Sequence, residues 1–239
     1  MLDGEESAAR SRADDIATQP YEITRERLRD PRVLDEMRAR QPGMKLRTDA
    51  ELDASLHATL AGRRPGEPVW VFGYGSLIWN PAFEFAERRV GLIHGWHRRF
   101  CLWMISGRGS PEVPGLMLAL DRGGSCRGIA YRLSERQVAD ELILVWRREM
   151  LSGVYHARWV EAATATGPVR AITFTANRAH DRFVALPEER VAEMVGQARG
   201  ALGSCRDYLD RTVEHLETLG FRDAALERIR ARVGTRGHP

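Results

Sequence analysis

Two glycines flank a tyrosine directly after an apolar run, in the stretch Val-Trp-Val-Phe-Gly-Tyr-Gly-Ser-Leu at residues 69–77. The β-branched and aromatic run, bounded by turn residues, predicts a strand that is covered on both faces. Gly73 and Gly75 then permit backbone angles closed to other residues and let a ligand approach the main chain. Because successive N–H groups converge in such a loop, it predicts a small site for a carboxylate or a phosphate.

An ordinary turn is the competing interpretation of this loop, since many strands end in a glycine-containing turn. Two better-known phosphate patterns are missing: no third glycine completes a dinucleotide fingerprint, and no Gly-Lys-Ser/Thr follows. Nucleotide binding is therefore disfavoured. Tyr74 and Ser76 place hydrogen-bonding groups beside the amides, without the Asn or Asp of an ordinary hairpin turn, and this favours a ligand site.

Glu149 is the second group whose position suggests chemistry. It lies at the C-terminal end of a predicted helix, where the macrodipole disfavours a negative charge, and Trp146 precedes it by three residues. Both influences predict a raised pKa for this carboxyl, as a general base or acid that works near neutrality requires. The alternative is a surface glutamate that pairs with Arg147 or Arg148.

The elements that must position these groups are short strands followed by helices. The pattern predicts strands at 69–73, 89–94, 98–105, 115–121, 126–133, 156–163 and 169–176. A helix is expected before the sixth strand, with a Ser134–Gln137 capping box and a closing Gly153, and further helices after Pro187. Its apolar stripe comprises Val138, Leu142 and Val145. This order predicts an α+β domain in which helices pack a curled, mixed sheet.

The segment before this domain reads as an extension. Its first twenty residues are small, polar and acid-rich, which predicts a loosely attached tail. Asp30 with Pro31 predicts one helix start, and Thr48 with Glu51 predicts a capping box for a second helix. The turn-rich residues 61–66 place the domain boundary, with an extension at 1–67 and the main domain at 68–239. The extension could pack on the sheet, mediate self-association or cover a pocket.

Composition excludes several classes of protein. The 239 residues are 43% hydrophobic and 29% charged with a net charge of +3, as in a soluble globular domain. The basic residues are almost all arginines interleaved with acids, which predicts an ion-paired surface without a nucleic-acid partner. No run approaches the roughly 20 apolar residues that cross a bilayer, so no membrane association is expected. A monomer suits the size and the lack of an apolar interface stripe.

The three cysteines, Cys101, Cys126 and Cys205, are widely spaced and follow no signal segment. They predict reduced thiols in the cytoplasm, and no histidine pair is spaced to complete a zinc site with them. Cys101 is nevertheless a rival nucleophile, since a thiolate can attack a carbonyl carbon. Its apolar neighbours predict a buried, inert thiol instead.

Several separated motifs together resemble the ChaC family of γ-glutamylcyclotransferases. They are Val-Phe-Gly-Tyr-Gly-Ser-Leu with Ile-Trp-Asn-Pro at 71–81, Arg-Arg-Phe at 98–100, Trp-Arg-Arg-Glu-Met at 146–150 with Gly153 and Tyr155, and Asp-Tyr-Leu at 207–209. The resemblance covers residues 68 to about 230, in the family's order. It implies that the α-amine of a γ-glutamyl group attacks its own γ-carbonyl, forming 5-oxoproline. In ChaC-like enzymes the substrate is glutathione and the other product is cysteinylglycine.

The resemblance also assigns roles to residues. Glu149 is the expected general base and acid, and no metal or organic cofactor is implied. The expected substrate-binding residues are Val71, Phe72, Gly73, Tyr74, Gly75, Ser76, Leu77, Tyr155 and Tyr208. Either Tyr155 or Tyr208 could equally be an amphipathic residue at the edge of the core. Arg98 and Arg99 point to opposite faces of a strand, so at most one of them faces the site, and a surface ion pair is the expected role of such an arginine.

Two other functions stay open at this point. One is a cyclotransferase for other γ-glutamyl amines or amino acids, which would share the glutamyl-head pocket and differ around the leaving group. The other is a non-catalytic regulatory module that uses the same cavity. Glu149 argues against the module, because a binder without turnover could dispense with the base.

Overall fold

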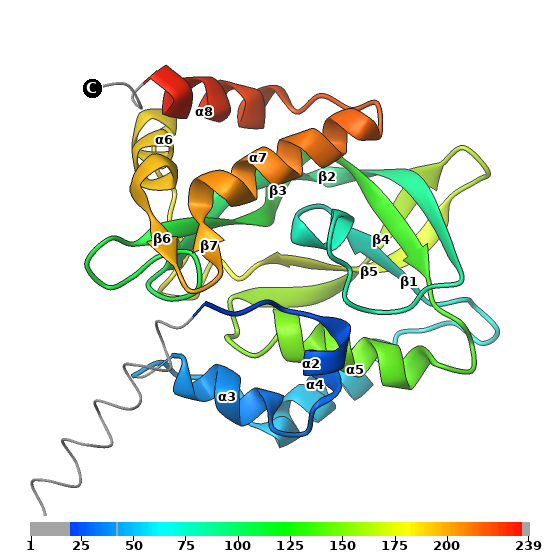
Figure 1. The fold of residues 1–239 in the computed structure, drawn as a ribbon. Helices are drawn as coiled ribbons and strands as arrows, with labels where there is room; N and C mark the ends of the chain where they lie inside the picture. Colours follow the sequence, from blue (N-terminus) through cyan, green and yellow to red (C-terminus); the bar gives the residue numbers. More distant parts are fainter. Residues whose placement is uncertain (1–19, 42, 236–239) are drawn as a thin grey trace, which may run out of the picture.

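Five strands close into a barrel in the computed structural model, which describes residues 20–41 and 43–235 (Figure 1). The strands are β1 (Trp70–Gly73), β2 (Glu87–Met104), β3 (Gly115–Arg132), β4 (Tyr155–Thr164) and β5 (Val169–Ala176). Their order is β1-β3-β2-β4-β5, and β3 also pairs with β5. Because β1 runs parallel to β5 and antiparallel to β3, the barrel is mixed, which confirms the predicted curled, mixed sheet.

Two pairs of predicted strands are in fact single long strands. The segments 89–94 and 98–105 belong mainly to β2, and 115–121 and 126–133 belong to β3. Gly95, Gly123 and Gly124 have positive φ angles of 80°, 96° and 67°, which the sequence pattern read as turns. In the structure they bend two strands that keep pairing on both sides, with a register irregularity between His94 and Trp96.

Helix α5 (Val138–Glu149) connects β3 to β4 and supplies the end that carries Glu149. Its predicted stripe of Val138, Leu142 and Val145 is buried, with 8%, 0% and 1% exposure. The predicted capping box is wrong, because Gln137 is the N-cap residue and no side chain caps the helix. Trp146 fixes the last turn: its indole N–H donates to Ser55 Oγ at 2.9 Å.

Three helices of the N-terminal extension form a layer with α5 below the barrel in Figure 1. They are α2 (Arg25–Arg29), α3 (Val33–Ala39) and α4 (Asp49–Leu60). The predicted Thr48–Glu51 box is confirmed, since Glu51 N–H donates to Thr48 Oγ1 at 3.2 Å and Thr48 N–H to Glu51 Oε2 at 2.8 Å. The predicted start at Asp30 is wrong: Asp30 ends α2, and α3 begins after Arg32. The predicted tail lies almost entirely at residues 1–19, outside the described residues.

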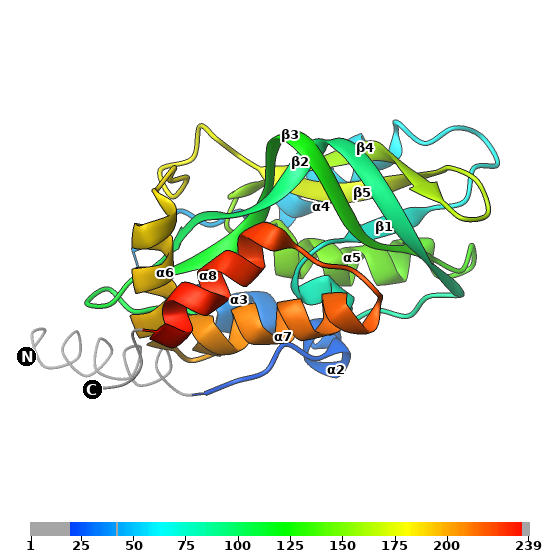
Figure 2. The same cartoon turned by 90° about the horizontal axis from the view of Figure 1, so that it is seen from above.

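The helices after Pro187 cover the opposite side of the barrel. They are α6 (Glu188–Gln197), α7 (Cys205–Thr218) and α8 (Ala224–Thr235), with the short strands β6 (Arg199–Gly200) and β7 (Gly203–Ser204) before α7. Figure 2 shows α7 and α8 beside each other on this side. A capping box begins α7, because Asp207 N–H donates to Ser204 Oγ at 2.9 Å. This box places Tyr208 in the first turn of the helix.

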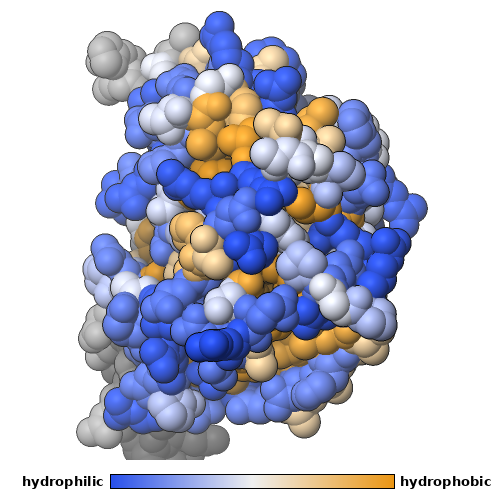
Figure 3. All heavy atoms as spheres, turned by 90° about the vertical axis from the view of Figure 1, so that its right-hand side faces the viewer, coloured by the Kyte–Doolittle hydropathy of each residue, from blue (hydrophilic) through white to orange (hydrophobic). Residues whose placement is uncertain are grey.

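The surface is polar over most of the face shown in Figure 3, with apolar residues in separate groups. Among the described residues, the large hydrophobic side chains that are exposed are Phe85, Val90 and Val113. No helix in the part of the chain that the structure describes has the length and apolar character needed to span a membrane.

Candidate active site

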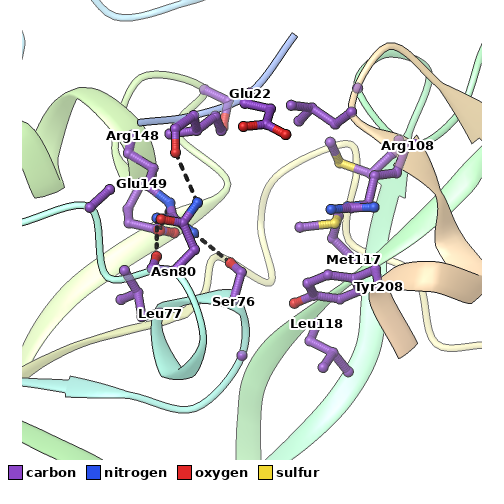
Figure 4. A pocket seen from close by; sticks show the side chains of 18 of the residues that line it. Glu22, Ser76, Leu77, Asn80, Arg108, Met117, Leu118, Arg148, Glu149 and Tyr208 are labelled. Atoms are coloured by element: carbon purple, nitrogen blue, oxygen red, sulfur yellow. Dashed lines mark hydrogen bonds and ion pairs between the residues drawn. The ribbon is translucent and has the colours of Figure 1, made fainter. Parts of the chain in front are cut away.

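A cavity of about 920 Å³ lies where the barrel, the end of α5, the start of α7 and the N-terminal extension meet. Most of the predicted site residues line it, namely Tyr74, Gly75, Ser76, Leu77, Glu149, Tyr155 and Tyr208. Residues more than 130 positions apart in the sequence thus face one space (Figure 4). Val71, Phe72 and Gly73 are not among the lining residues. They belong to β1, which pairs with β3 and β5. From this position they hold the loop in place, and direct contact with a substrate is not indicated.

The loop after β1 turns at Gly75 into a short 3-10 helix, η1 (Ser76–Ile78). The N–H groups of Gly75, Ser76 and Leu77 donate no hydrogen bond to another described residue, as expected for the first amides of a helical turn. Ile78 N–H, in contrast, donates to Gly75 O at 2.9 Å. The first three amides are therefore available to an anion in the cavity.

Arg98 holds this loop from the barrel side. The Arg98 guanidinium donates to Tyr74 O at 2.5 Å and to Arg127 O at 2.7 Å, and it pairs with Asp223 at 2.5 Å. With 6% exposure Arg98 is buried, so the expected surface ion pair is wrong for this residue. Arg99 points to the other face, where it is half-buried and pairs with Asp121 at 3.2 Å. The carbonyl oxygen of Tyr74 thus accepts a hydrogen bond from a buried cation.

Arg148 links the loop to the end of α5. Its guanidinium donates to Ser76 Oγ at 2.7 Å and to Asn80 O at 2.6 Å, and its Nε lies 3.0 Å from Glu149 Oε1 (Figure 4). Because Ser76 Oγ accepts this hydrogen bond, its own O–H stays available to donate. Arg148 therefore joins both halves of the candidate site. The sequence suggested it only as a surface partner of Glu149.

Glu149 is the last residue of α5, and its side chain is 13% exposed. Burial raises the pKa of Glu149 above its ordinary value, while the nearby positive charge of Arg148 opposes the rise. Both sequence interpretations are therefore partly right: the carboxylate does pair with Arg148, but it does so inside a cavity. A carboxyl in such surroundings can take up and return a proton.

The three tyrosines differ in the hydrogen bonds that they make. Tyr74 donates its hydroxyl proton to Phe174 O at 2.7 Å, and Tyr155 donates to Leu118 O at 3.0 Å. Neither hydroxyl therefore has a free proton for a substrate carboxylate, although Tyr74 was expected to donate to that carboxylate and Tyr155 to bind the substrate. The hydroxyl of Tyr208 makes no hydrogen bond with another described residue and faces the loop at Gly75. Burial raises the pKa of Tyr208 to about 12, so the phenol keeps its proton as a donor.

Cys101 does not line the cavity and is fully buried. Burial raises the pKa of its thiol to about 12, which leaves almost no thiolate near neutrality. The structure therefore disfavours Cys101 as a rival nucleophile.

The N-terminal extension covers one side of the cavity. Residues 20–25 line it, and their backbone is tied down by hydrogen bonds from Tyr21 N–H to Ala201 O at 3.0 Å and from Asn80 Nδ2 to Ile23 O at 2.8 Å. Arg25 adds an ion pair of 2.5 Å with the buried Glu141 of α5. Of the three placements considered for the extension, the structure shows two: residues 20–25 cover the pocket, and α4 packs against β4, where Trp159 Nε1 donates to Thr59 O at 2.9 Å. No local pattern in the sequence signals these contacts, because each partner lies far along the chain.

The close approach of Gly75 to Tyr208 generates a stability prediction. A Cβ at position 75 would lie 2.8 Å from the hydroxyl oxygen of Tyr208, but 4.0 Å from the next nearest atom of that ring. Gly75→Ala should therefore lower the free energy of unfolding in urea by about 1–3 kcal/mol. Adding Tyr208→Phe removes the hydroxyl and should recover at least half of that loss. The packing described here would be contradicted if the double variant lost as much unfolding free energy as the two single variants lose together.

The raised pKa of Glu149 generates a pH prediction. The folded protein binds this proton more tightly than the unfolded chain does, so protonation of Glu149 stabilises the fold below the ordinary pKa of 4.5. That contribution is lost as the pH rises through the raised value. The stability of the wild type relative to Glu149→Gln should therefore fall between pH 4.5 and neutrality, measured by urea unfolding across that interval. A relative stability that rises over the interval would contradict a raised pKa.

The chain is similar in sequence to known proteins. The family model described as "ChaC-like protein" matches residues 69–236. The glutathione-specific γ-glutamylcyclotransferase of Escherichia coli is 45% identical over 175 residues, covering 72% of this chain and 76% of that protein. The human glutathione-specific γ-glutamylcyclotransferase 1 is 32% identical over 183 residues, covering 72% and 82%.

The fold also has a solved counterpart. A crystal structure of the selenomethionine-labelled γ-glutamyl cyclotransferase specific to glutathione from yeast superposes with a TM-score of 0.66, covering 72% of this chain and 98% of that one. Its sequence is 19% identical, so this likeness concerns the fold alone. The family match, which covers well over half of the chain, and the two relatives show that this chain belongs to the ChaC-like family.

Proposed function

We propose that this chain is a γ-glutamylcyclotransferase that cleaves glutathione into 5-oxoproline and cysteinylglycine. The names of the relatives support the reaction and the substrate. The observation that carries the proposal is that the free amides of Gly75–Leu77 and the buried carboxyl of Glu149 face the same cavity and are joined through Arg148. An anion site and a proton acceptor side by side suit an amino acid head group.

The loop would hold the α-carboxylate of the γ-glutamyl group. The amides of Gly75, Ser76 and Leu77 offer N–H donors, and the hydroxyls of Ser76 and Tyr208 offer two more protons on the same side. With the carboxylate held there, the flexible side chain of the glutamyl group can fold back until its γ-carbonyl approaches its own α-amine. Because both reacting groups belong to one molecule, holding this conformer can supply several kcal/mol of the barrier.

Glu149 would move the proton. The α-amine has an ordinary pKa of about 8 and is largely protonated near neutrality, so it must lose a proton before it attacks. Glu149 accepts that proton, the amine nitrogen bonds to the γ-carbonyl carbon, and the ring closes. Glu149 then returns a proton to the amide nitrogen as its bond to the carbonyl carbon breaks. The ring nitrogen still holds one proton too many, and it passes this second proton through Glu149 to the departing amine, which leaves as an ammonium group. Two protons thus move from the attacking nitrogen to the leaving nitrogen, so atoms and charges balance without a cofactor, and a raised pKa of Glu149 suits these transfers.

We also propose a cytoplasmic location and a monomeric state for this protein. The three cysteines are free and buried, which supports an expectation that the protein works in the cytoplasm. Among the described residues, the large hydrophobic side chains that are exposed are Phe85, Val90 and Val113, and this small number supports a monomer.

Glu149→Gln should keep the fold and lose turnover of glutathione by about 10²- to 10⁴-fold, because the amide cannot accept the proton. The measurement is 5-oxoproline formation from glutathione, with the unfolding transition as a check on the fold. Glu189→Gln is the matched control, since Glu189 is 60% exposed on α6 and does not line the cavity. Full activity of Glu149→Gln would rule out the assigned role.

A substrate panel separates the remaining alternatives. Chromatography of the products from glutathione and from γ-glutamyl amino acids should show cysteinylglycine as the preferred leaving group. Faster release of free amino acids would instead identify a cyclotransferase for other γ-glutamyl compounds. A well-folded wild type that forms no 5-oxoproline from any member of the panel would identify a binding module.

A further inference from the structure

Arg108 is a buried cation that faces the cavity opposite Glu149 (Figure 4). Its side chain is not used in the reaction outlined above. Arg108 Nη1 donates to Ser204 O at 2.9 Å, and its guanidinium carbon lies 5.1 Å from the centre of the Tyr208 ring. No described carboxylate lies within ion-pair distance of it, although its exposure is 8%. A buried charge without a counter-charge is costly, so a space beside it that is open to ligands favours an anion.

Neither of two acids on this side of the cavity, Asp207 and Glu22, forms an ion pair with Arg108. Asp207 acts on Arg108 electrostatically, but its Oδ2 accepts the N–H of Ser204 in the cap of α7. Glu22 lines the cavity at the edge of the N-terminal extension, where it is exposed to solvent and makes no ion pair with a described residue. Arg108 therefore keeps donors that the protein itself does not satisfy with a carboxylate.

The backbone around Arg108 is fixed before any ligand arrives. Cys205 Sγ donates to Arg108 O at 3.1 Å, and Leu202 N–H donates to Gly107 O at 2.7 Å. A Cβ at Gly115 would lie 2.5 Å from Arg108 O, and a Cβ at Gly200 would lie 2.4 Å from Gly107 O. Gly115 and Gly200 thus allow their two segments to approach the backbone of residues 107–108 closely. A cation held in this way is pre-organised, which reduces the entropy lost when it binds a ligand.

We propose that Arg108 binds the terminal carboxylate of the leaving group, and so selects γ-glutamyl compounds whose leaving group ends in a carboxylate. The proposal rests on the proposed function. Tyr208 relates the two ends of the cavity, because its hydroxyl faces the loop at Gly75 while Arg108 lies over its ring. A dipeptide spans at most about 7 Å, so a leaving group that starts near the loop ends within reach of the region beyond this ring.

Arg211 is the competing cation. It also lines the cavity and lies over an aromatic ring, with its guanidinium carbon 5.4 Å from the centre of Trp79. Arg211 is exposed to solvent, where a charge is screened and binds a carboxylate weakly. Arg108 is favoured because it is buried, and Arg211 supplies the matched control.

The test compares glutathione with its C-terminal glycine amide, which lacks only the charge. Binding of both compounds to Glu149→Gln is measured by calorimetry, and turnover of both is measured with the active protein. The acid should bind about 10- to 100-fold more tightly than the amide, as expected for a charge-assisted hydrogen bond. Adding Arg108→Gln should reduce this preference to about twofold or less, whereas adding Arg211→Gln should leave it unchanged. Arg108→Lys, which keeps the charge but loses the fork of donors, should retain part of it.

The outcomes separate the failures. An unchanged preference in Arg108→Gln, or its loss in Arg211→Gln alone, overturns the role of Arg108. An equal loss of affinity for acid and amide in Arg108→Gln also overturns it, because a merely structural role predicts that result. If Arg108→Gln does not fold, the ratio of the affinities for glutathione and for its amide is measured in Arg108→Lys instead, and a ratio unchanged from that of the parent protein overturns the proposal. Absent 5-oxoproline together with an Arg108-dependent preference would overturn the proposed function and keep the carboxylate site.

Discussion

The arrangement of the site depends on one buried cation, Arg148. A guanidinium with 6% exposure must satisfy its donors within the protein, because leaving them unpaired would cost several kcal/mol. It does so with the hydroxyl of Ser76, the carbonyl of Asn80 and the carboxylate of Glu149. These oxygens come from the loop after β1 and from the end of α5. Arg148 thereby fixes the distance between the anion site and the proton acceptor, and it keeps a charged form of Glu149 accessible despite burial.

Local patterns were enough to predict much of the fold and half of the site. The apolar run before Gly73 predicts β1, the spacing of Val138, Leu142 and Val145 predicts the buried face of α5, and Glu149 lies at its end as expected. These features depend on neighbours in the sequence. The long bent strands β2 and β3 were missed because a glycine permits a turn and a bend alike, and pairing with the partner strand decides between them.

The rest of the site could not be read from the sequence, because its contacts join distant segments. Arg98 finds its partners at residues 74, 127 and 223, which turns an arginine expected at the surface into an internal support for the loop. The hydroxyls of Tyr74 and Tyr155 are used by carbonyls of β5 and β3. Tyr208 is left to face the cavity. The N-terminal extension, outside the residues matched by the family model, closes one side of it.

The most direct measurement for this account is a crystal structure of Glu149→Gln with glutathione bound. The account predicts the α-carboxylate on the amides of Gly75–Leu77 and the α-amine within hydrogen-bond distance of the side chain at position 149. The amine nitrogen should lie about 3–3.5 Å from the γ-carbonyl carbon, as in a conformer ready to react. A glutathione molecule bound in the reverse direction, with its glycine carboxylate on the loop and its α-amine away from position 149, would contradict it.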